Sequence, residues 1–300
     1  MKMFGFFALA ASALIAEPVK YDETLYPEWA QTFEVSKEIL REKTECQDLV
    51  IFENPRFGRV LALDGIIQLT EADEPIYHEM MVHVPLFTHE NPTSVLVVGG
   101  GDGGILREVL KHDSVQRAVL VDIDSSVIEL SKKYFPKVSN GSHDDPRVEV
   151  VIQDASKFIK ETEESFDVII CDSSDPIGPS AVLFTNEFYG DCKVHLNKDG
   201  IFVNMSGVPF LQKHEQALTL QNSSPHFNHV KFYLAPVPTY VGGFMAMGFA
   251  SDRNYDVPEE VLKSRLGDLG GTLFYYTPEI HKAAFALPNF MLVQLQETNH

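Results

Sequence analysis

Short apolar runs alternate with amphipathic segments from Ser94 onward. Runs of four or five apolar residues are typical of buried strands, and the amphipathic stretches between them are typical of crossover helices. The expected strands span 95–98, 118–121, 148–152, 168–171 and 201–204, and the expected helices include 125–134 and 186–195. This alternation predicts a doubly wound α/β fold on parallel strands. Two later β-rich segments, 230–234 and 244–250, are expected to extend its sheet.

The first part of the chain carries short β-type segments at 49–52, 59–63 and 66–70. Asp64 and Gly65 join the last two and form a strong hairpin signal, because both positions of such a turn need positive φ. A helix should begin after Asp73, which suits the N-cap position, and run through Met81. We therefore expect an apolar extension, a small antiparallel β domain and a larger α/β domain, over 1–20, 21–75 and 76–300.

A glycine-rich turn, Gly99-Gly100-Gly101-Asp102-Gly103-Gly104, follows the first strand of the α/β domain. Glycines let the backbone approach a ligand closely, and Asp122 ends the next strand where a ribose-binding acid belongs. The turn therefore indicates a nucleoside site, with plain close packing as the alternative. A bound pyrophosphate would favour backbone amides without an acid, so Asp102 in the turn argues for a ligand that bears positive charge.

Composition narrows the choice of ligands and compartments. The formal net charge of −19 opposes binding to nucleic acid or to an anionic membrane and favours small cations. Three widely spaced cysteines without a CxxC pair argue against a disulfide framework or a structural zinc site and indicate a reducing compartment. In contrast, Lys2 and the apolar run 4–16 have the form of a secretory signal, which would leave a mature chain starting near Glu17. The alternative is an N-terminal extension that packs on the surface or on a partner.

The loop Asp172-Ser173-Ser174-Asp175-Pro176 follows another apolar strand and brings two carboxylates close together. A free alkylamine is mostly protonated at neutral pH and needs a base before its lone pair can attack. An aspartate at a strand end can accept that proton. Asp154, after the strand 148–152, is placed to accept hydrogen bonds from an adenine amino group. For each acid alone, turn chemistry or helix capping is the alternative.

Several motifs together resemble the spermidine synthase family. They are Gln47-Asp48-Leu49-Val50-Ile51-Phe52, Leu63-Asp64-Gly65-Ile66-Ile67-Gln68, Tyr77-His78-Glu79-Met80, the glycine-rich turn, the Asp172–Pro176 loop, Pro238-Thr239-Tyr240 and His281-Lys282-Ala283-Ala284-Phe285. They occur in the family's order and cover about residues 21 to 290. The resemblance implies a methyltransferase-like (Rossmann-type) fold. It also implies transfer of an aminopropyl group from decarboxylated S-adenosylmethionine, as a cosubstrate, to putrescine, giving spermidine and methylthioadenosine.

By this resemblance Asp172 would be the catalytic base. The amine acceptor would be held by Tyr77, His78, Asp175 and Tyr240. The nucleoside would be bound by Gln47, Gly99, Gly101, Asp122, Asp154, Ala155 and Pro179. Asp102 would face the aminopropyl ammonium and repel the carboxylate of ordinary S-adenosylmethionine.

Four positions depart from the family pattern. Ala181 and Met205 stand where a glutamate and a glutamine are common, so the amine end should be more apolar and the acceptor is left open among putrescine, cadaverine and spermidine. Asp122 replaces a usual glutamate and Ala155 a usual glycine, which are milder changes at the nucleoside end.

Two other functions are weighed: an S-adenosylmethionine-dependent amine N-methyltransferase, against which Asp102 counts, and a non-catalytic nucleoside- or polyamine-binding descendant. No metal site is expected, because His78 and His83 stand five apart and point to different helix faces. By resemblance the chain should form a homodimer or homotetramer in the cytoplasm, or be secreted if its apolar start is a signal peptide.

Overall fold

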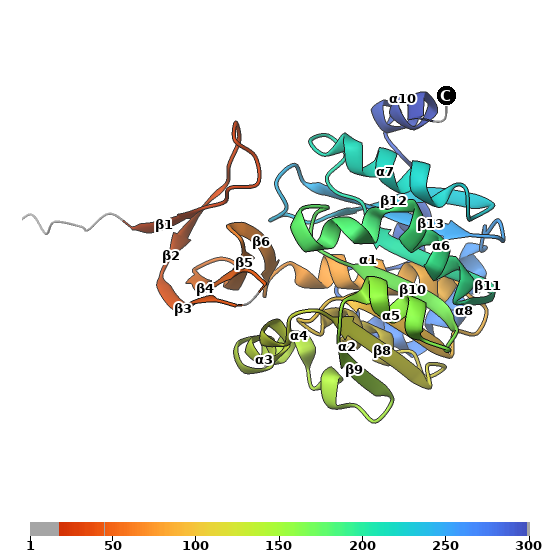
Figure 1. Cartoon of the computed structure of the whole chain (residues 1–300), viewed down its shortest axis with the longest axis horizontal. Helices are drawn as coiled ribbons and strands as arrows, with labels where there is room; N and C mark the ends of the chain where they lie inside the picture. The colour runs from red at the N-terminus through yellow and green to blue at the C-terminus, as the bar shows by residue number, and fades with distance from the viewer. Residues whose placement is uncertain (1–17, 45, 299–300) are drawn as a thin grey trace, which may run out of the picture.

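Two small antiparallel sheets and one seven-stranded sheet make up the β-structure of the computed structural model, which describes residues 18–44 and 46–298 (Figure 1). The N-terminal strands, red to orange in the figure, extend from the larger α/β body. They are β1 (Val19–Asp22), β2 (Thr32–Val35), β3 (Lys37–Lys43), β4 (Asp48–Asn54), β5 (Gly58–Leu63) and β6 (Ile66–Thr70). β3 to β6 pair antiparallel in chain order, and β1 pairs with β2. The antiparallel N-terminal sheet is thus confirmed.

The predicted hairpin between β5 and β6 is present. Asp64 and Gly65 adopt φ values of 49° and 87°, as a two-residue turn of this kind requires. β1, β2 and β3 were not predicted. β3 has no fully buried residue and a mixed charge pattern, so it carries no apolar alternation that could reveal it.

The larger sheet has the strand order β12-β13-β11-β10-β7-β8-β9. Its strands are β7 (Ser94–Gly99), β8 (Arg117–Asp122), β9 (Val148–Ile152), β10 (Phe166–Asp172), β11 (Leu196–Met205), β12 (His229–Pro236) and β13 (Phe244–Ser251). β7 to β11 run parallel, whereas β13 pairs antiparallel with β11 and β12. The doubly wound fold and the two added strands are confirmed. Strand order reverses between β7 and β10, where such sheets bind ligands.

Helices cover both faces of this sheet. They are α1 (Glu74–Thr88), α2 (Gly104–Leu110), α3 (Ser125–Tyr134), α4 (Pro136–Ser139), α5 (Ala155–Glu161), α6 (Asn186–Val194), α7 (Lys213–Ser223), α8 (Glu259–Leu266), α9 (Pro278–Ala284) and α10 (Asn289–Thr298). Three 3-10 turns span Ser142–Asp144, Gly178–Phe184 and Gly267–Thr272. α1 lies at the centre of the molecule and is buried along nearly its whole length (Figure 1). Side chains on α1 therefore keep fixed positions relative to the sheet.

One local prediction is wrong. Asp73 occupies the N-cap position of α1, but its side chain does not cap the helix. Its carboxylate instead accepts hydrogen bonds from Thr70 and from the backbone and hydroxyl of Thr239. These bonds tie the start of α1 to the turn that carries Tyr240.

Two expectations concern the start of the chain and membranes. The signal-like segment 4–16 lies outside the described residues. Among the helices of residues 18–44 and 46–298, none has the length and apolar character needed to cross a membrane.

Candidate active site

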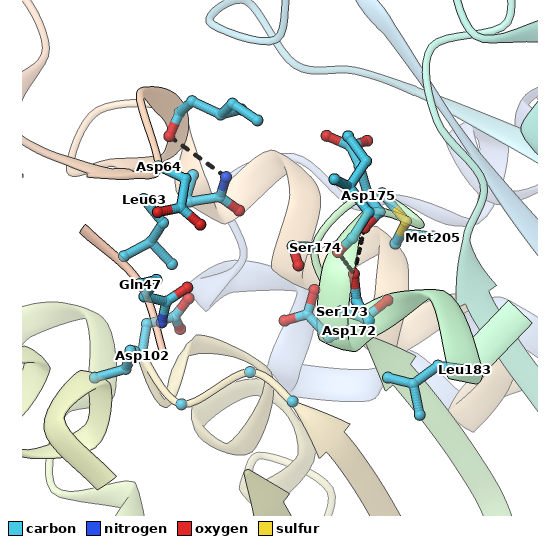
Figure 2. A pocket seen from close by; sticks show the side chains of 18 of the residues that line it. Gln47, Leu63, Asp64, Asp102, Asp172, Ser173, Ser174, Asp175, Leu183 and Met205 are labelled. Carbon is cyan, nitrogen blue, oxygen red and sulfur yellow. Dashed lines mark hydrogen bonds between the residues drawn. The ribbon is translucent and has the colours of Figure 1, made fainter. Parts of the chain in front are cut away.

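A cavity of about 260 Å³ opens at the carboxyl ends of β7, β8 and β10. All thirteen residues singled out from the sequence line it: Gln47, Tyr77, His78, Gly99, Gly101, Asp102, Asp122, Asp154, Ala155, Asp172, Asp175, Pro179 and Tyr240. Figure 2 shows Gln47, Leu63 and Asp64 of the N-terminal part across the pocket from Asp172, Asp175 and Met205. The N-terminal part and the seven-stranded sheet thus form opposite walls of one site.

Asp172 stands at the end of β10, where it pairs with Gly99 of β7. Its backbone carbonyl accepts a hydrogen bond from the Gly100 amide at 3.0 Å, and its Oδ1 accepts one from the Tyr77 hydroxyl at 2.6 Å. Burial and the nearby Asp102 raise the pKa of the Asp172 carboxyl to about 6. Asp172 is therefore a stronger base than an ordinary aspartate and is still mostly ionised at pH 7.

Asp102 and His78 form a charged pair beside it. His78 Nε2 lies 3.6 Å from Asp102 Oδ1, and the same oxygen accepts the Gly104 amide hydrogen at 2.6 Å. Burial opposes a charge on His78, but Asp102 and Glu74 outweigh it and raise its pKa to about 10. The Asp102 pKa is lowered in turn, because His78 outweighs the cost of burial. Both groups are charged at neutral pH.

The ligand atoms of His78, Asp102 and Asp172 lie within 4.8 Å of one another, which is close enough for one small cation. An ammonium group suits two carboxylates. A doubly protonated imidazole has no lone pair to offer a metal ion. The cluster therefore fits an organic amine better than a metal.

The end of the cavity predicted to hold the amine combines apolar walls with an acid. The ring of Tyr240 packs edge-on against Tyr77 at 5.7 Å, and its hydroxyl donates to the Gln68 carbonyl at 2.9 Å. Asp175 Oδ1 accepts a hydrogen bond from Gln212 at 2.8 Å. Met205 lines this part of the cavity. These walls suit a methylene chain that ends in a positive charge.

Of the two departures expected at the amine end, only Met205 lines the cavity. Ala181 is exposed and lies outside the set of lining residues. Its replacement of an acid therefore leaves the wall of the cavity unchanged.

The other end offers acids to a nucleoside. Asp122 ends β8, and its carboxylate accepts the Asp124 amide at 2.8 Å. Burial raises the pKa of Asp122 to about 6. Gln47 donates to Asp124 at 3.1 Å, which links the N-terminal sheet to this end. Asp154 caps α5 through the Ser156 amide and also lines the cavity, so the capping interpretation is confirmed and the ligand interpretation stays a prediction.

The backbone of the glycine-rich turn lies very close to Asp172, Asp122 and His78. A Cβ on Gly99 would lie 2.1 Å from the Asp172 carbonyl, one on Gly101 2.7 Å from Asp122 Oδ2, and one on Gly104 2.2 Å from the His78 ring. Real Cβ atoms do not come this close to other atoms. The glycines therefore let Asp172, Asp122 and His78 converge, in addition to leaving room for a ligand.

Sequence reasoning missed several groups at the site. Glu23 and Gln212 line the cavity, but they belong to segments with no recognisable motif. Glu74 and Arg107 lie behind it and bond to each other at 2.7 and 2.8 Å. The spacing of Glu74 and His78, four residues apart in one helix, was the only local signal for this second group.

The geometry brings three features together in one cavity: acids at the carboxyl ends of β8 and β9, the buried carboxylate of Asp172, and apolar walls beside Asp175. Comparisons with known proteins agree with this combination. A family model described as "Spermine/spermidine synthase domain" matches residues 74–259, and one described as "Spermidine synthase tetramerisation domain" matches residues 19–71.

Individual relatives and solved structures extend the match over most of the chain. A polyamine aminopropyltransferase of Pectobacterium atrosepticum is 48% identical over 278 residues, covering 91% of this chain and 96% of that protein. Polyamine aminopropyltransferase 1 of Pseudomonas aeruginosa is 48% identical over 274 residues, with the same coverage of both chains.

Among solved structures, spermidine synthase in complex with the transition state analogue AdoDATO superposes with a TM-score of 0.88 at 40% identity, covering 94% of this chain and 97% of that one. The Thermotoga maritima spermidine synthase gives 0.87 at 41% identity, covering 94% and 95%. The chain therefore belongs to the spermine/spermidine synthase family and is a polyamine aminopropyltransferase.

Proposed function

We propose that this enzyme transfers the aminopropyl group of decarboxylated S-adenosylmethionine to putrescine, with Asp172 as the base. The amine nitrogen attacks the methylene carbon next to the sulfonium, the carbon–sulfur bond breaks, and methylthioadenosine leaves as a neutral thioether. The proton lost by the amine passes to Asp172 and then to solvent. Because the sulfonium is already an activated leaving group, alignment and deprotonation are the protein's main tasks.

The position and pKa of Asp172 carry this proposal. Its backbone carbonyl is held by the Gly100 amide, its carboxylate accepts the Tyr77 hydroxyl, and the residue lines the cavity. A pKa of about 6 lets it remain ionised at pH 7 while making it a better proton acceptor than an ordinary aspartate. Asp175 and the wall formed by Tyr240 would hold the rest of the diamine. Gln47, Asp122 and Asp154 would hold the nucleoside.

The test is product formation by the purified full chain. Decarboxylated S-adenosylmethionine and putrescine should give equal amounts of methylthioadenosine and spermidine, measured by chromatography. Asp172→Asn keeps the shape of the side chain but not the base, so turnover should fall by a factor on the order of 10² to 10⁴. Asp191→Asn, in α6 and away from the cavity, is the matched control and should keep full activity. If no diamine or triamine is converted, the assignment of acceptor and cosubstrate is wrong.

Asp102 provides a separate test of the cosubstrate. We propose that its carboxylate faces the aminopropyl ammonium, so that the carboxylate of intact S-adenosylmethionine would be repelled. Asp102→Ile should reduce the preference for the decarboxylated form by about tenfold or more, which corresponds to roughly 1.4 kcal/mol. Competition binding of the two forms measures this preference. If the ratio of the two affinities is the same in Asp102→Ile and in the wild type, Asp102 does not select the decarboxylated form.

We also propose that the enzyme assembles as a homotetramer through residues 19–71. The match of these residues to a tetramerisation domain supports assembly. Mass photometry of the full chain over a dilution series should show four-chain particles. A particle of two chains at every concentration would favour the homodimer.

A further inference from the structure

A line of buried charges runs from the cavity into the protein behind it. Glu74 in α1 accepts a hydrogen bond from His78 Nδ1 at 2.6 Å, and His78 Nε2 faces Asp102 at 3.6 Å. Arg107 in α2 donates to both carboxylate oxygens of Glu74, at 2.7 and 2.8 Å. The same guanidinium also bonds Glu108 at 2.7 Å. Asp102, His78, Glu74 and Arg107 thus alternate in charge from the cavity inward.

His78 has almost no freedom within this line. Its side chain is 2% exposed, and its ring lies against Gly104, where any Cβ would be 2.2 Å from a ring carbon. The charged or titratable groups around it come from four segments: Glu74 and Tyr77 of α1, Asp102 of the glycine-rich turn, Arg107 of α2, and Asp172 of β10. Both ring nitrogens face a carboxylate. Neither is left to accept a hydrogen bond from the substrate.

The charges of this group leave Asp172 as its one acid without a paired cation. Arg107 offsets Glu74, and His78 offsets one of the two cavity acids, Asp102 and Asp172. One net negative charge then remains at the place where an ammonium is bound and loses its proton. A neutral His78 would leave two uncompensated acids there, and Asp172 would ionise less readily beside Asp102.

We propose that Glu74 and Arg107 are positioning residues that hold His78 as a permanent imidazolium against Asp102, and that this fixed cation sets the proton affinity of the base Asp172. The inference rests on the proposed role of Asp172. It gives His78 a different task from that expected from the sequence: His78 orients and neutralises Asp102, and the substrate amine is bound by the carboxylates.

The first experiment measures the charge of His78 directly and needs no catalysis. Magic-angle-spinning NMR of protein labelled with ¹⁵N-histidine distinguishes imidazolium from neutral imidazole, and a His78→Gln sample identifies the signal. His78 should remain an imidazolium at pH 8.5 in the wild type. In Glu74→Gln the hydrogen-bond acceptor is kept but its charge is lost, so His78 should lose its proton at a much lower pH and be neutral already near pH 6, where Asp172 titrates. A neutral His78 in the wild type at pH 8.5 overturns the proposal.

The second experiment tests the consequence for Asp172. In Glu74→Gln the acid limb of the kcat/KM profile should move to higher pH by about half a unit or more, because Asp172 loses a neighbouring cation. Arg107→Lys should give a smaller shift in the same direction, because a lysine keeps the charge but not the paired contact. This second variant also covers the case in which Glu74→Gln folds poorly.

The matched control is Glu79→Gln. Glu79 is another buried carboxylate of α1, and it binds the backbone amides of Phe274, Tyr275 and Tyr276 away from the cavity. Its loss should lower stability without moving the acid limb. If the acid limb moves equally in Glu79→Gln and Glu74→Gln, or does not move in Glu74→Gln, the charge of His78 does not set the proton affinity of Asp172. If the NMR result holds and Asp172→Asn remains active, the role of Asp172 fails while the fixed charge of His78 stands.

Discussion

The hydroxyl of Tyr77 donates to Asp172 Oδ1 and stabilises the ionised form of this carboxylate. Burial and Asp102 act in the opposite direction and favour the protonated form. The proton affinity of the base is therefore a balance between a few neighbours, each of which a single substitution can remove. The wild-type kcat/KM should accordingly fall as the pH drops through about 6.

Replacement of Tyr77 by phenylalanine should weaken the ionised form of Asp172. The acid limb of the kcat/KM profile should then move to higher pH by about one unit, as expected for loss of roughly 1.4 kcal/mol of a charge-assisted hydrogen bond, and activity at pH 7 should fall about twofold. Steady-state kinetics from pH 5 to pH 9 measures both effects.

Tyr255→Phe is the control for this change, because the Tyr255 hydroxyl donates to the Asp199 carbonyl far from Asp172. It should leave the acid limb in place. A profile of Tyr77→Phe that coincides with that of the wild type would show that this hydrogen bond does not tune the base.

At the scale of elements, the turn between β7 and α2 positions Asp172, the proposed base. Gly99 adopts a φ of 74°, and its Cα faces the carbonyl of Asp172. Gly99→Ala should strain the backbone and push β10 away from β7. We expect a fall in the unfolding temperature of several degrees and loss of more than 99% of the activity, measured by calorimetry and by turnover.

Gly141→Ala is the matched control. Gly141 has nearly the same φ, 76°, but no atom lies within 4 Å of a Cβ built there. It should cost about 1 kcal/mol of stability for the left-handed backbone and leave turnover unchanged. If Gly99→Ala and Gly141→Ala lose activity equally, the loss comes from strain in the left-handed backbone and not from the contact between residue 99 and Asp172.

The accuracy of prediction from sequence also depends on the element. β7, β8, β10 and β11 were found because each contains a buried run that is almost wholly apolar, whereas β9 is only half-buried and was found from its valines and isoleucine. The acids at the ends of these strands could then be placed on one edge of the sheet. β1 and β3 are exposed, so their residues carry no pattern. Glu23 and Gln212 reach the cavity from segments far apart in the chain, and only the three-dimensional packing brings them together.

For the molecule as a whole, two buried groups make folding sensitive to alkaline pH. Burial and the charge of Asp175 raise the pKa of Glu215 to about 9, and His78 has a pKa of about 10. Both bind a proton more tightly in the folded chain than in the unfolded one, so stability is lost as the pH rises toward these values. The buried His112 and His281 have lowered pKa values and oppose this trend only below about pH 6.5.

The free energy of unfolding should therefore fall between pH 7 and pH 9, by up to about 1.4 kcal/mol per pH unit for each of the two groups. Urea unfolding at fixed protein concentration measures this slope. Glu215→Gln should reduce the slope, because glutamine has no proton to lose. An identical slope in the variant would show that Glu215 does not hold its proton in the folded enzyme.

The amine end of the cavity is closed by contacts between segments that are very distant in sequence. Gln31 donates to the carbonyl of Thr239, and Tyr240 donates to that of Gln68, across 208 and 172 positions. Such contacts form late in folding, because a long loop must close before they contribute any stability. During refolding, the helical signal should therefore return before the enzyme regains catalysis, because we expect the amine end of the cavity to be among the last parts of the protein to form.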